Sequence, residues 1–346
     1  DPLDPCTNGK LCNKCLTLDE SVNHPDRLKY PMRRAGERGE NKWERISWDE
    51  AYDVIEAKVK EIWETDGGNA IICVHGTGRN INWQVPFFGQ AGLKTPNIST
   101  FGFTGFACYM PRVCGCIAPF GDFTVVDASQ CHADRYNNPE WKAPEVIVVW
   151  GNEPLASNAD GYIGHWLVQC VQMGTKIISI DPVLTWWGVR AAYWLDLRPG
   201  TDLCIALAWL YVITQEDLID HEFVDLWCAY YDELKEHCKQ FTPEWAAKIT
   251  GVPAEDIIGS ARLYAGAERG AIQWGLAADQ KTNGMQHGQV TVDLMAITGN
   301  LDVPGGQILP GTGAGHNESG FGFEKGVGEE LQKKMIGLDQ YPAYCM

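Results

Sequence analysis

Two short apolar runs in the middle of the chain predict buried parallel strands. Residues 145–150 read Glu-Val-Ile-Val-Val-Trp, and residues 176–180 read Lys-Ile-Ile-Ser-Ile. Strands that are buried on both faces show such continuous runs, whereas half-exposed strands alternate between apolar and polar residues. A helical pattern over about residues 159–173 lies between the two runs. This region therefore predicts a strand–helix–strand unit of a doubly wound fold.

Amphipathic spacing and capping residues predict further helices and strands on both sides of this unit. Ser47 and Glu50 form a capping-box pattern that opens an amphipathic helix. The apolar side of that helix consists of Ala51, Val54, Ile55, Val59 and Ile62. Thr201 is expected to cap a helix over 202–213. The other expected elements are strands at 70–74 and 271–274, and helices at about 217–227, 242–249, 253–266 and 287–298. Thr242 and Pro243 are expected to open the helix at 242–249.

The distribution of these elements predicts an α/β protein in three parts. Residues 1–45 are rich in Pro, Gly and charge and predict an irregular segment, and residues 304–328 predict a Gly-rich loop. We expect a Rossmann-like doubly wound domain over 104–284. A discontinuous α/β domain is expected over 46–103 and 285–346.

The charge of the chain excludes one large class of partner. Twenty-eight basic residues against 45 acidic ones give a formal net charge of −17, whereas nucleic-acid binding needs a basic surface. A small anionic cofactor stays compatible, because backbone N–H groups at helix starts bind phosphate without net positive charge. No apolar run approaches the roughly 20 residues of a membrane span, so no direct membrane span is expected.

The chain has thirteen cysteines, of which most are single residues in apolar stretches, while six fall in two clusters. Isolated cysteines of this kind are typical of buried thiols in a reduced protein, which favours the cytoplasm, although export after folding leaves the same pattern. The clusters are Cys6, Cys12 and Cys15, and Cys108, Cys114 and Cys116. Cys12 and Cys15 fit a zinc, redox or iron–sulfur pair, or incidental loop cysteines. Cys108, near Arg112, fits either an acidified metal-binding thiolate or a buried thiol.

Three strand ends carry residues suited to a nucleotide-bearing cofactor. Gly151 and Asn152 follow the first apolar run, and Asp181 follows the second. Thr201 and Asp202 lie in a tight turn into a helix, where the carboxylate could pair with a guanine edge. Loops at the carboxyl edge of such sheets converge on a crevice. The same residues also serve as plain turns and caps, and no Gly-x-Gly-x-x-Gly or phosphate-loop run supports an ordinary NAD or ATP site.

Taken in order, the short motifs along nearly the whole chain resemble the catalytic subunits of the dimethyl sulfoxide reductase superfamily, which use bis-molybdopterin guanine dinucleotide. The matching segments are residues 9–14, 24–31, 36–39, 43–51, 181–182, 198–202, 249–253, 282–284 and 299–306. A single motif of this set is unspecific, but the ordered series is specific.

The resemblance implies roles for individual residues. Cys12 matches the last of four cysteines that hold a 4Fe–4S cluster, and Lys14 the lysine between cluster and pterin. Cys108 matches the protein ligand to molybdenum or tungsten, with Arg112 beside it. The residues that match the binding of one guanine dinucleotide are Gly151, Asn152, Asp181, Thr201 and Asp202. Those that match cofactor-lining turns are Gly78, Trp274, Asn283 and Gly284.

The departures from the family pattern narrow the expected chemistry. Val183 stands where the family usually has Arg, which removes one cofactor contact, and Tyr109 stands where formate dehydrogenases have His, which disfavours formate oxidation. The first three cluster cysteines have no counterparts, and residues 1–45 match only the remnant of an iron–sulfur-proximal domain. We therefore expect the chain to be a fragment of a longer protein, truncated at both ends. Three ligands of the cluster are missing from it, and both dinucleotides are expected only in the full-length enzyme.

The resemblance implies an oxidoreductase that transfers an oxygen atom or electron pair to a small-molecule substrate, with an iron–sulfur electron-transfer subunit as a possible partner. Two alternatives stay open. The Cys ligand is similar to that of acetylene hydratase and catechol-dehydroxylase-like branches, which favours a non-redox hydratase or lyase on the same cofactor. An inactive cofactor-binding or electron-transfer module is the other alternative.

Overall fold

The computed structural model describes residues 9, 11, 13–75, 84–100, 110–130, 138–157, 162–309 and 327–340. The chain divides into two compact units, which we call the large unit and the small unit. The large unit comprises residues 1–17 and 106–313, and the small unit comprises residues 18–105 and 314–346.

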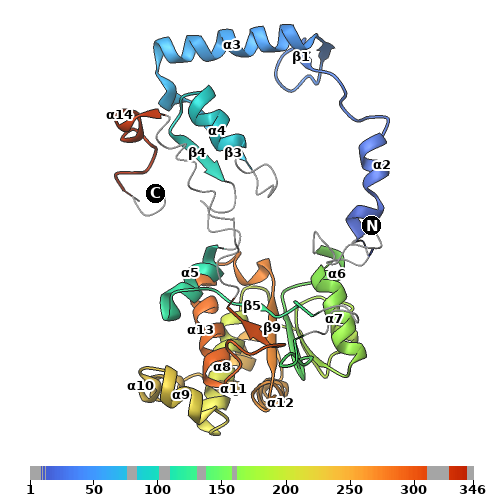
Figure 1. Ribbon diagram of the computed structural model, residues 1–346, viewed down its shortest axis with the longest axis vertical. Coiled ribbons are helices and arrows are strands. Elements are labelled where there is room, and N and C mark those ends of the chain that lie inside the picture. The colour runs from blue at the N-terminus through green and yellow to red at the C-terminus, as the bar shows by residue number, and fades with distance from the viewer. Residues whose placement is uncertain are drawn as a thin grey trace. The chain divides into compact units, whose positions relative to one another are not determined.

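A four-stranded parallel sheet with the order β8-β7-β6-β9 forms the centre of the large unit (Figure 1). Its strands are β6 (Val146–Trp150), β7 (Lys176–Ile180), β8 (Tyr193–Leu195) and β9 (Gly270–Trp274). Every residue of β6 is buried, which explains its continuous apolar run. The chain leaves β6 toward β7 on one side and has β9 on the other. The carboxyl ends of β6 and β9 therefore flank the topological switch point, where doubly wound folds bind ligands.

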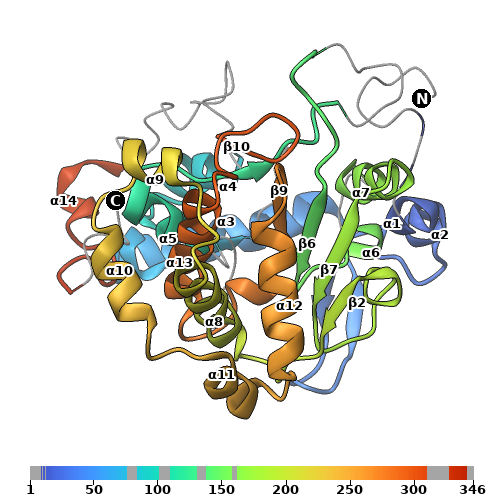
Figure 2. The same cartoon turned by 90° about the horizontal axis from the view of Figure 1, so that it is seen from below.

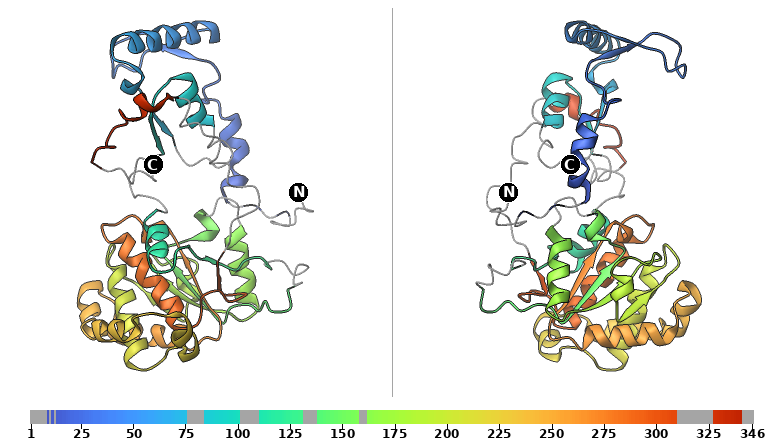
Figure 3. Two further views of the ribbon diagram at one scale, coloured as in Figure 1. Left: turned by 60° about the vertical axis from the view of Figure 1, so that its left-hand side comes forward. Right: turned by 90° about the vertical axis from the view of Figure 1, so that its right-hand side faces the viewer.

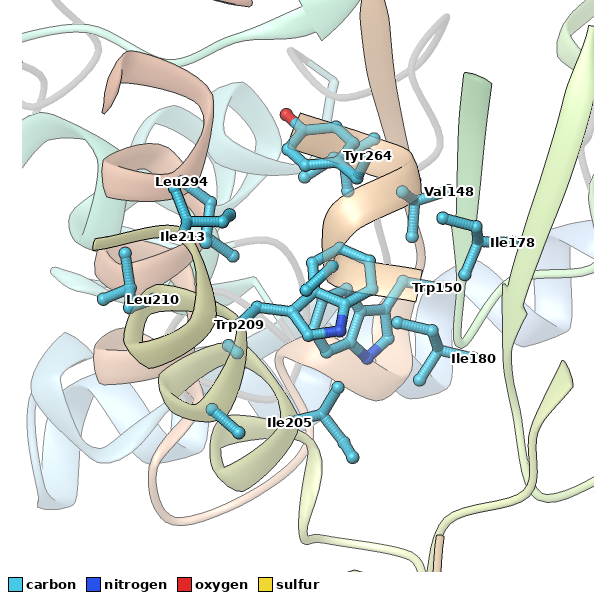
Figure 4. Close-up of a cluster of buried hydrophobic side chains, with 14 of the residues drawn as sticks. Val148, Trp150, Ile178, Ile180, Ile205, Trp209, Leu210, Ile213, Tyr264 and Leu294 are labelled. Carbon is cyan, nitrogen blue, oxygen red and sulfur yellow. The ribbon is translucent and has the colours of Figure 1, made fainter. Parts of the chain in front are cut away.

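Helices cover both faces of this sheet, which confirms the α/β fold. Figure 2 shows α7 (Tyr162–Gln172) on one side of the strands and α8 (Asp202–Gln215) and α12 (Ala254–Ala265) on the other. Each face has its own buried cluster. The cluster on the α8 side includes Trp150, Trp209 and Tyr264, of which Trp209 and Tyr264 stack at 5.7 Å between ring centroids (Figure 4). The α7 side buries Ile147, Val149, Trp166 and Leu167.

Glycines allow α5 (Met110–Phe120) and α13 (Gly284–Ile297) to pack closely. A Cβ on Gly115 would lie 2.5 Å from the Met285 carbonyl oxygen and 2.9 Å from the Gly288 Cα, so a larger residue would separate the helices. This packing, together with contacts to α8, places α13 in the large unit. The sequence had assigned residues 285–346, and with them most of α13, to the discontinuous domain. The division into domains as a whole stays a prediction.

Several helix starts differ from the sequence expectations because the capping side chains form hydrogen bonds with other groups. Thr201 occupies the N-cap of α8, but its hydroxyl donates to the Arg198 carbonyl at 2.6 Å and makes no side-chain cap. The helix expected over 217–227 begins later, as α9 (His221–Trp227), because Asp220 caps it by accepting from the Phe223 N–H. Thr242 caps α11 (Pro243–Thr250) as expected. The polar helix α10 (Tyr231–Cys238) was not predicted.

The segment after α13 fastens β9 to its surroundings through buried amides. Asn300 accepts from the Gly270 N–H at 2.5 Å, and Gln307 accepts from the Ile272 N–H at 3.0 Å. Gln307 belongs to β10 (Gln307–Ile308), which pairs antiparallel with β5 (Val125–Val126) and corrects the prediction of a loop from residue 304. In the described residues, the Gly-Asn-Leu-Asp-Val-Pro-Gly-Gly motif over 299–306 thus has a structural role.

The small unit contains more regular structure than its sequence suggests (Figure 3). Residues 1–45 were expected to be irregular, but α2 (Leu18–Asn23) is helical and β1 (Met32–Arg34) pairs with β2 (Trp43–Arg45) as an antiparallel hairpin. The short helix α1 (Asn13–Leu16), also within that segment, belongs to the large unit. The remaining elements of the small unit are α3 (Trp48–Thr65), η1 (Gly68–Ala70), β3 (Ile72–His75), α4 (Gln84–Phe87), η2 (Phe88–Gly92), β4 (Asn97–Thr100) and α14 (Glu329–Gln332).

The helix α3 confirms the capping box that the sequence predicts, but its apolar residues are exposed or half-buried. Both hydrogen bonds of the Ser47–Glu50 capping box form, at 3.1 and 2.7 Å. However, α3 buries none of its residues, and Val54 and Ile55 are 51% and 54% exposed. No helix in the described ranges is long and apolar enough to cross a membrane.

Candidate cofactor site at the carboxyl edge of the parallel sheet

Two glycine turns bring the chain close to itself at the switch point. Gly151 follows β6 with φ +53°, and its N–H donates to the Ile180 carbonyl at 2.8 Å. A Cβ on Gly151 would lie 2.5 Å from the Ala277 Cβ, and a Cβ on Gly275 would lie 2.3 Å from the Gly151 carbonyl oxygen. Only glycine fits either position. The turns that follow β6 and β9 therefore pack directly against each other at the carboxyl edge of the sheet.

Lys14 lies at the helix that follows the β6 turn. Asn152 leads from Gly151 into α6 (Pro154–Ser157), and the Lys14 ammonium donates to the Ser157 carbonyl at 2.9 Å. This bond ties α1 to the carboxyl end of α6. The structure therefore places Lys14 beside the segment that carries Gly151 and Asn152.

Asp181, at the end of β7, organises its own turn. Its Oδ1 accepts from the Val183 N–H at 2.8 Å, and its backbone carbonyl accepts from Trp194 Nε1 at 2.9 Å. Burial raises the pKa of the Asp181 carboxyl above its usual value, although the Val183 hydrogen bond opposes this change. The nearby Asp202 carboxylate raises the pKa further. Asp181 therefore does stabilise a turn, as the sequence allowed as an alternative to cofactor binding. The turn hydrogen bond also fixes the position of its carboxylate at the edge of the sheet.

Asp202, the first residue of α8, is held by two donors in a nearly dry environment. Its Oδ1 accepts from Trp150 Nε1 at 2.9 Å, and its Oδ2 lies 2.5 Å from the Lys281 ammonium. The Asp202 and Lys281 side chains are only 8% and 7% exposed. Burial lowers the pKa of Lys281, while the Asp202 carboxylate opposes that change. This ion pair joins the start of α8 to the segment between η4 (Leu276–Ala278) and α13.

A second buried ion pair anchors the start of α5. Arg112 Nε lies 2.9 Å from Asp279 Oδ2, with the two side chains 12% and 0% exposed. The Arg112 backbone N–H also donates to Asp279 Oδ1 at 3.1 Å, and its Nη1 donates to the Trp274 carbonyl at 2.7 Å. Arg112 was expected near Cys108, which lies outside the described residues, so that expectation stays a prediction. Within the described residues Arg112 pairs with Asp279 and positions α5.

Several buried polar atoms at this edge have no hydrogen-bond partner within the described part of the chain. They include both ring nitrogens of His287, Asn283 Oδ1 and, apart from its ion pair, Lys281 Nζ. The His287 ring packs edge-on against Trp150 at 4.7 Å and also contacts Trp274. Burial and the neighbouring Lys281 lower the pKa of His287 to about 3, which keeps the imidazole neutral at pH 7. Unpaired buried polar atoms are costly, so their presence here favours a bound polar ligand.

The predicted site residues therefore fall into two groups. Lys14 and Arg112 tie neighbouring helices to the carboxyl edge of the sheet, and Trp274 is the last residue of β9. The residues in the turns or helix starts that follow the sheet strands are Gly151, Asn152, Asp181, Thr201, Asp202, Asn283 and Gly284. Cys12, Gly78 and Cys108 lie outside the described residues. In the ranges that are described, no group of three or more His, Cys, Asp or Glu side chains could hold a metal ion.

Sequence reasoning missed Asp279, Lys281 and His287. Their one visible signal is three polar or charged residues around the Thr-Asn-Gly motif, in a segment otherwise expected to be a turn. Their partners Arg112 and Asp202 are far away in the sequence; Arg112 and Asp279 are 167 positions apart. Spacing along the chain could not reveal these pairs.

Comparison with known proteins agrees with this architecture. A family profile described as molybdopterin oxidoreductase matches residues 27–338. The chain is 31% identical over 329 residues to a probable dimethyl sulfoxide reductase chain YnfF of Escherichia coli K12, covering 86% of this chain and 38% of that protein. It is 30% identical over 346 residues to an acetylene hydratase of Syntrophotalea acetylenica, covering 96% of this chain and 44% of that protein.

A solved structure is also similar. The acetylene hydratase from Pelobacter acetylenicus matches with a TM-score of 0.75 and 28% identity, over 98% of this chain and 45% of that chain. The chain spans less than half the length of each of these relatives. The family profile nevertheless covers most of it. The chain belongs to the molybdopterin oxidoreductase family, within the dimethyl sulfoxide reductase superfamily.

Proposed function

We propose that the whole protein is a molybdenum- or tungsten-dependent oxidoreductase that uses two molybdopterin guanine dinucleotides and a 4Fe–4S cluster. The observation that carries the proposal is the carboxyl edge of the sheet, where two glycine turns meet unpaired buried polar atoms. Such an edge suits a large polar cofactor, and the family to which the chain belongs is that of molybdopterin enzymes.

The residues at this edge fit one guanine dinucleotide. Gly151 allows the backbone to approach a phosphate, and Asn152 offers both a donor and an acceptor. Asp181 and Asp202 offer carboxylates to hydroxyl and base donors, and Thr201 precedes the start of α8. The residues proposed to line the cofactor from the β9 side are Trp274, Asn283 and Gly284, together with Gly78, which lies outside the described residues.

We assign the metal ligand to Cys108, two residues before α5 in the sequence. A thiolate from Cys108 beside two pterin dithiolenes is a sulfur-rich ligand set, which suits a soft metal. When bound, the metal supplies the exchange of an oxygen atom or electron pair with the substrate. The chain contributes position, because Arg112, Asp279 and the Gly115 contact hold α5, which starts two residues after Cys108 in the sequence.

Lys14 is proposed to lie on the electron path between cluster and pterin, with Cys12 as one cluster ligand. What supports this is the Lys14–Ser157 hydrogen bond, which ties α1 to the helix after the Gly151 turn. Among the relatives are formate dehydrogenase alpha subunits of Methanococcus maripaludis, whose names imply further subunits. An iron–sulfur electron-transfer subunit is accordingly the proposed partner.

A hydratase is the second candidate function. The observation that favours it is the similarity of 98% of this chain to acetylene hydratase, with a TM-score of 0.75. In that case the cofactor, when bound, would supply activation of water for addition to an unsaturated bond, without net electron transfer. Turnover that requires neither an electron donor nor an acceptor would identify the hydratase.

The experiment that tests the main proposal is a cofactor analysis of the full-length protein. We expect molybdenum or tungsten by elemental analysis, a fluorescent oxidised pterin, and about two guanine nucleotides released per metal, which is the stoichiometry of the bis-dinucleotide cofactor. A purified, folded protein with neither metal nor pterin would contradict the proposal.

A further inference from the structure

We propose that an exposed patch at the end of α9 and the start of α10 docks a basic segment of a partner protein. The patch consists of Leu226, Trp227 and Tyr230, and we call it the α9–α10 patch. Three features of the molecule point to this role: the exposure of these side chains, the backbone conformation of Tyr230 and the charge around the patch.

The α9–α10 patch lies away from the carboxyl edge of the sheet. The helices α8 and α13 both begin near that edge, and α8 extends for 14 residues, which is about 20 Å. The segment that starts α9 meets the far end of α13, where the Asp220 N–H donates to the Ile297 carbonyl at 2.8 Å. Figure 1 shows α9 and α10 at the periphery of the large unit. The proposal is therefore independent of the proposed cofactor site.

Three large apolar side chains within five positions of the chain are exposed to solvent. Leu226 is 67% exposed, Trp227 76% and Tyr230 78%. Their neighbours Cys228 and Tyr231 pack instead against the hydrophobic core, which fixes the segment with the other side chains outward. The three exposed side chains together present roughly 400 Å², an area typical of interaction sites on protein surfaces. Trp and Tyr are also the side chains that contribute most to protein interfaces.

The backbone of Tyr230 is in the left-handed region, with φ +61° and ψ +30° at the N-cap of α10. Glycine, asparagine and aspartate adopt this conformation readily, whereas a bulky side chain there is uncommon. The Tyr230 side chain makes no cap hydrogen bond, and its high exposure shows that little packing offsets the strain. Strain of this kind is typical of functional sites. The tyrosine ring is therefore better explained by a contact with another molecule than by the fold.

The charge around the patch indicates the chemistry of the partner. The helices α9 and α10 carry one lysine and two histidines against five exposed carboxylates, which are Glu222, Asp225, Asp232, Glu233 and Glu236. Arg and Lys side chains pair with carboxylates and also stack on Trp and Tyr rings. A segment that combines Arg or Lys with apolar side chains is therefore complementary. A second copy paired about a two-fold axis would set carboxylates against carboxylates, and an anionic membrane would be repelled.

Binding of a designed peptide to the full-length protein tests this complementarity. The probe is a fluorescently labelled peptide of alternating arginine and leucine, followed by anisotropy. We expect it to bind, and the double variant Trp227→Ser, Tyr230→Ser to weaken the binding by at least about tenfold. A peptide with glutamate in place of arginine should not bind. Trp186→Ser, at a tryptophan that is 65% exposed outside the patch, is the matched control and should bind like the unchanged protein.

Two results of this experiment would overturn the proposal. One is the absence of binding by the arginine–leucine peptide. The other is equal binding by the unchanged protein and the double variant, which would show that the peptide responds only to the net charge of −17.

The variant Tyr230→Gly separates docking from a structural role of the tyrosine. Glycine adopts φ +61° without strain, so the variant should unfold at the same temperature as the unchanged protein or at a higher one. Its affinity for the peptide should nevertheless fall by about tenfold. A lower unfolding temperature would show that the tyrosine ring supports the fold, and would overturn its role in docking.

Photocrosslinking from the patch identifies the natural occupant. In the full-length protein p-benzoylphenylalanine replaces Tyr230, the cells that make the protein are irradiated, and mass spectrometry identifies the crosslinked peptide. A peptide from another protein with several Arg or Lys residues supports the proposal. A peptide from this protein, whether from the same molecule or a second copy, would overturn it. The same group in place of Val189, which is 66% exposed, is the control, and equal crosslinking at both positions would also overturn the proposal.

Discussion

The Lys281 ammonium lies 2.5 Å from Asp202 Oδ2 in a nearly dry environment, and this pair joins the start of α8 to the segment that leads into α13. A second buried pair, Arg112 with Asp279, joins the start of α5 to the same segment. Three helices therefore begin around one polar cluster beside the carboxyl ends of β6 and β9. Buried ion pairs as well as hydrophobic packing therefore hold the elements of the site together.

Breaking the Arg112–Asp279 pair should destabilise the chain strongly. Arg112→Met leaves the fully buried Asp279 carboxylate without its charged partner, and we expect the free energy of unfolding to fall by about 3–5 kcal/mol. Urea denaturation followed by circular dichroism measures it. Glu216→Gln, in the exposed pair with Arg262, is the control and should cost about 0–1 kcal/mol. Similar losses in both variants would show that the buried pair has no special role.

Gly151→Ala should destabilise the chain more than a change at a glycine with open surroundings. The alanine would have to keep φ at +53°, and its Cβ would lie 2.5 Å from the Ala277 Cβ. We therefore expect the free energy of unfolding to fall by about 2–5 kcal/mol from backbone strain and overpacking together. Gly121 has φ +84° with nothing within 4 Å of its Cβ position, and Gly121→Ala should lose only about 1–2 kcal/mol. Thermal or urea unfolding compares the two, and an equal loss would contradict the close approach of the two turns.

Asp293 on α13 predicts a specific pH dependence of stability. Burial raises the pKa of its carboxyl from 3.8 to about 6, so between these values the folded chain binds more protons than the unfolded chain. The stability contributed by this group therefore falls as pH rises from about 4 through 6.

Asp293→Asn removes that titration. At pH 7 the variant should be more stable than the unchanged chain by up to about 3 kcal/mol, which corresponds to a shift of about two pKa units. At pH 4 the two should differ little. Melting temperatures across this pH range provide the measurement, and a constant difference between the two proteins at every pH would contradict the assignment.

Local signals in the sequence predicted a large part of the fold, since the elements they specify depend on neighbours in the chain. The apolar runs of β6 and β7 and the caps at Ser47 and Thr242 all formed as expected. Thr201 shows where local reasoning fails. Its hydroxyl could accept from the start of α8, but a competing carbonyl on Arg198 lies 2.6 Å away and takes the hydrogen bond.

The sequence predicted the site residues at strand ends but not the residues that pair with them from other helices. Gly151, Asp181 and Asp202 could be identified because strand ends converge in a doubly wound sheet. Lys281 and Asp279 could not, because their partners come from other helices and only the folded chain brings them together. The exposed apolar side of α3 is the opposite case, since periodicity predicts an apolar face but not what covers it.

The most direct test of the central claim is the metal spectrum of the full-length protein with Cys108→Ser. We expect the unchanged protein to contain molybdenum or tungsten with sulfur ligands, and the variant to lose a metal–sulfur contribution in X-ray absorption together with at least about a hundredfold of activity. Cys116→Ala is the control, because burial raises the pKa of that thiol to about 12 and keeps it protonated; its spectrum should not change. An unchanged metal spectrum and activity in Cys108→Ser would contradict the account.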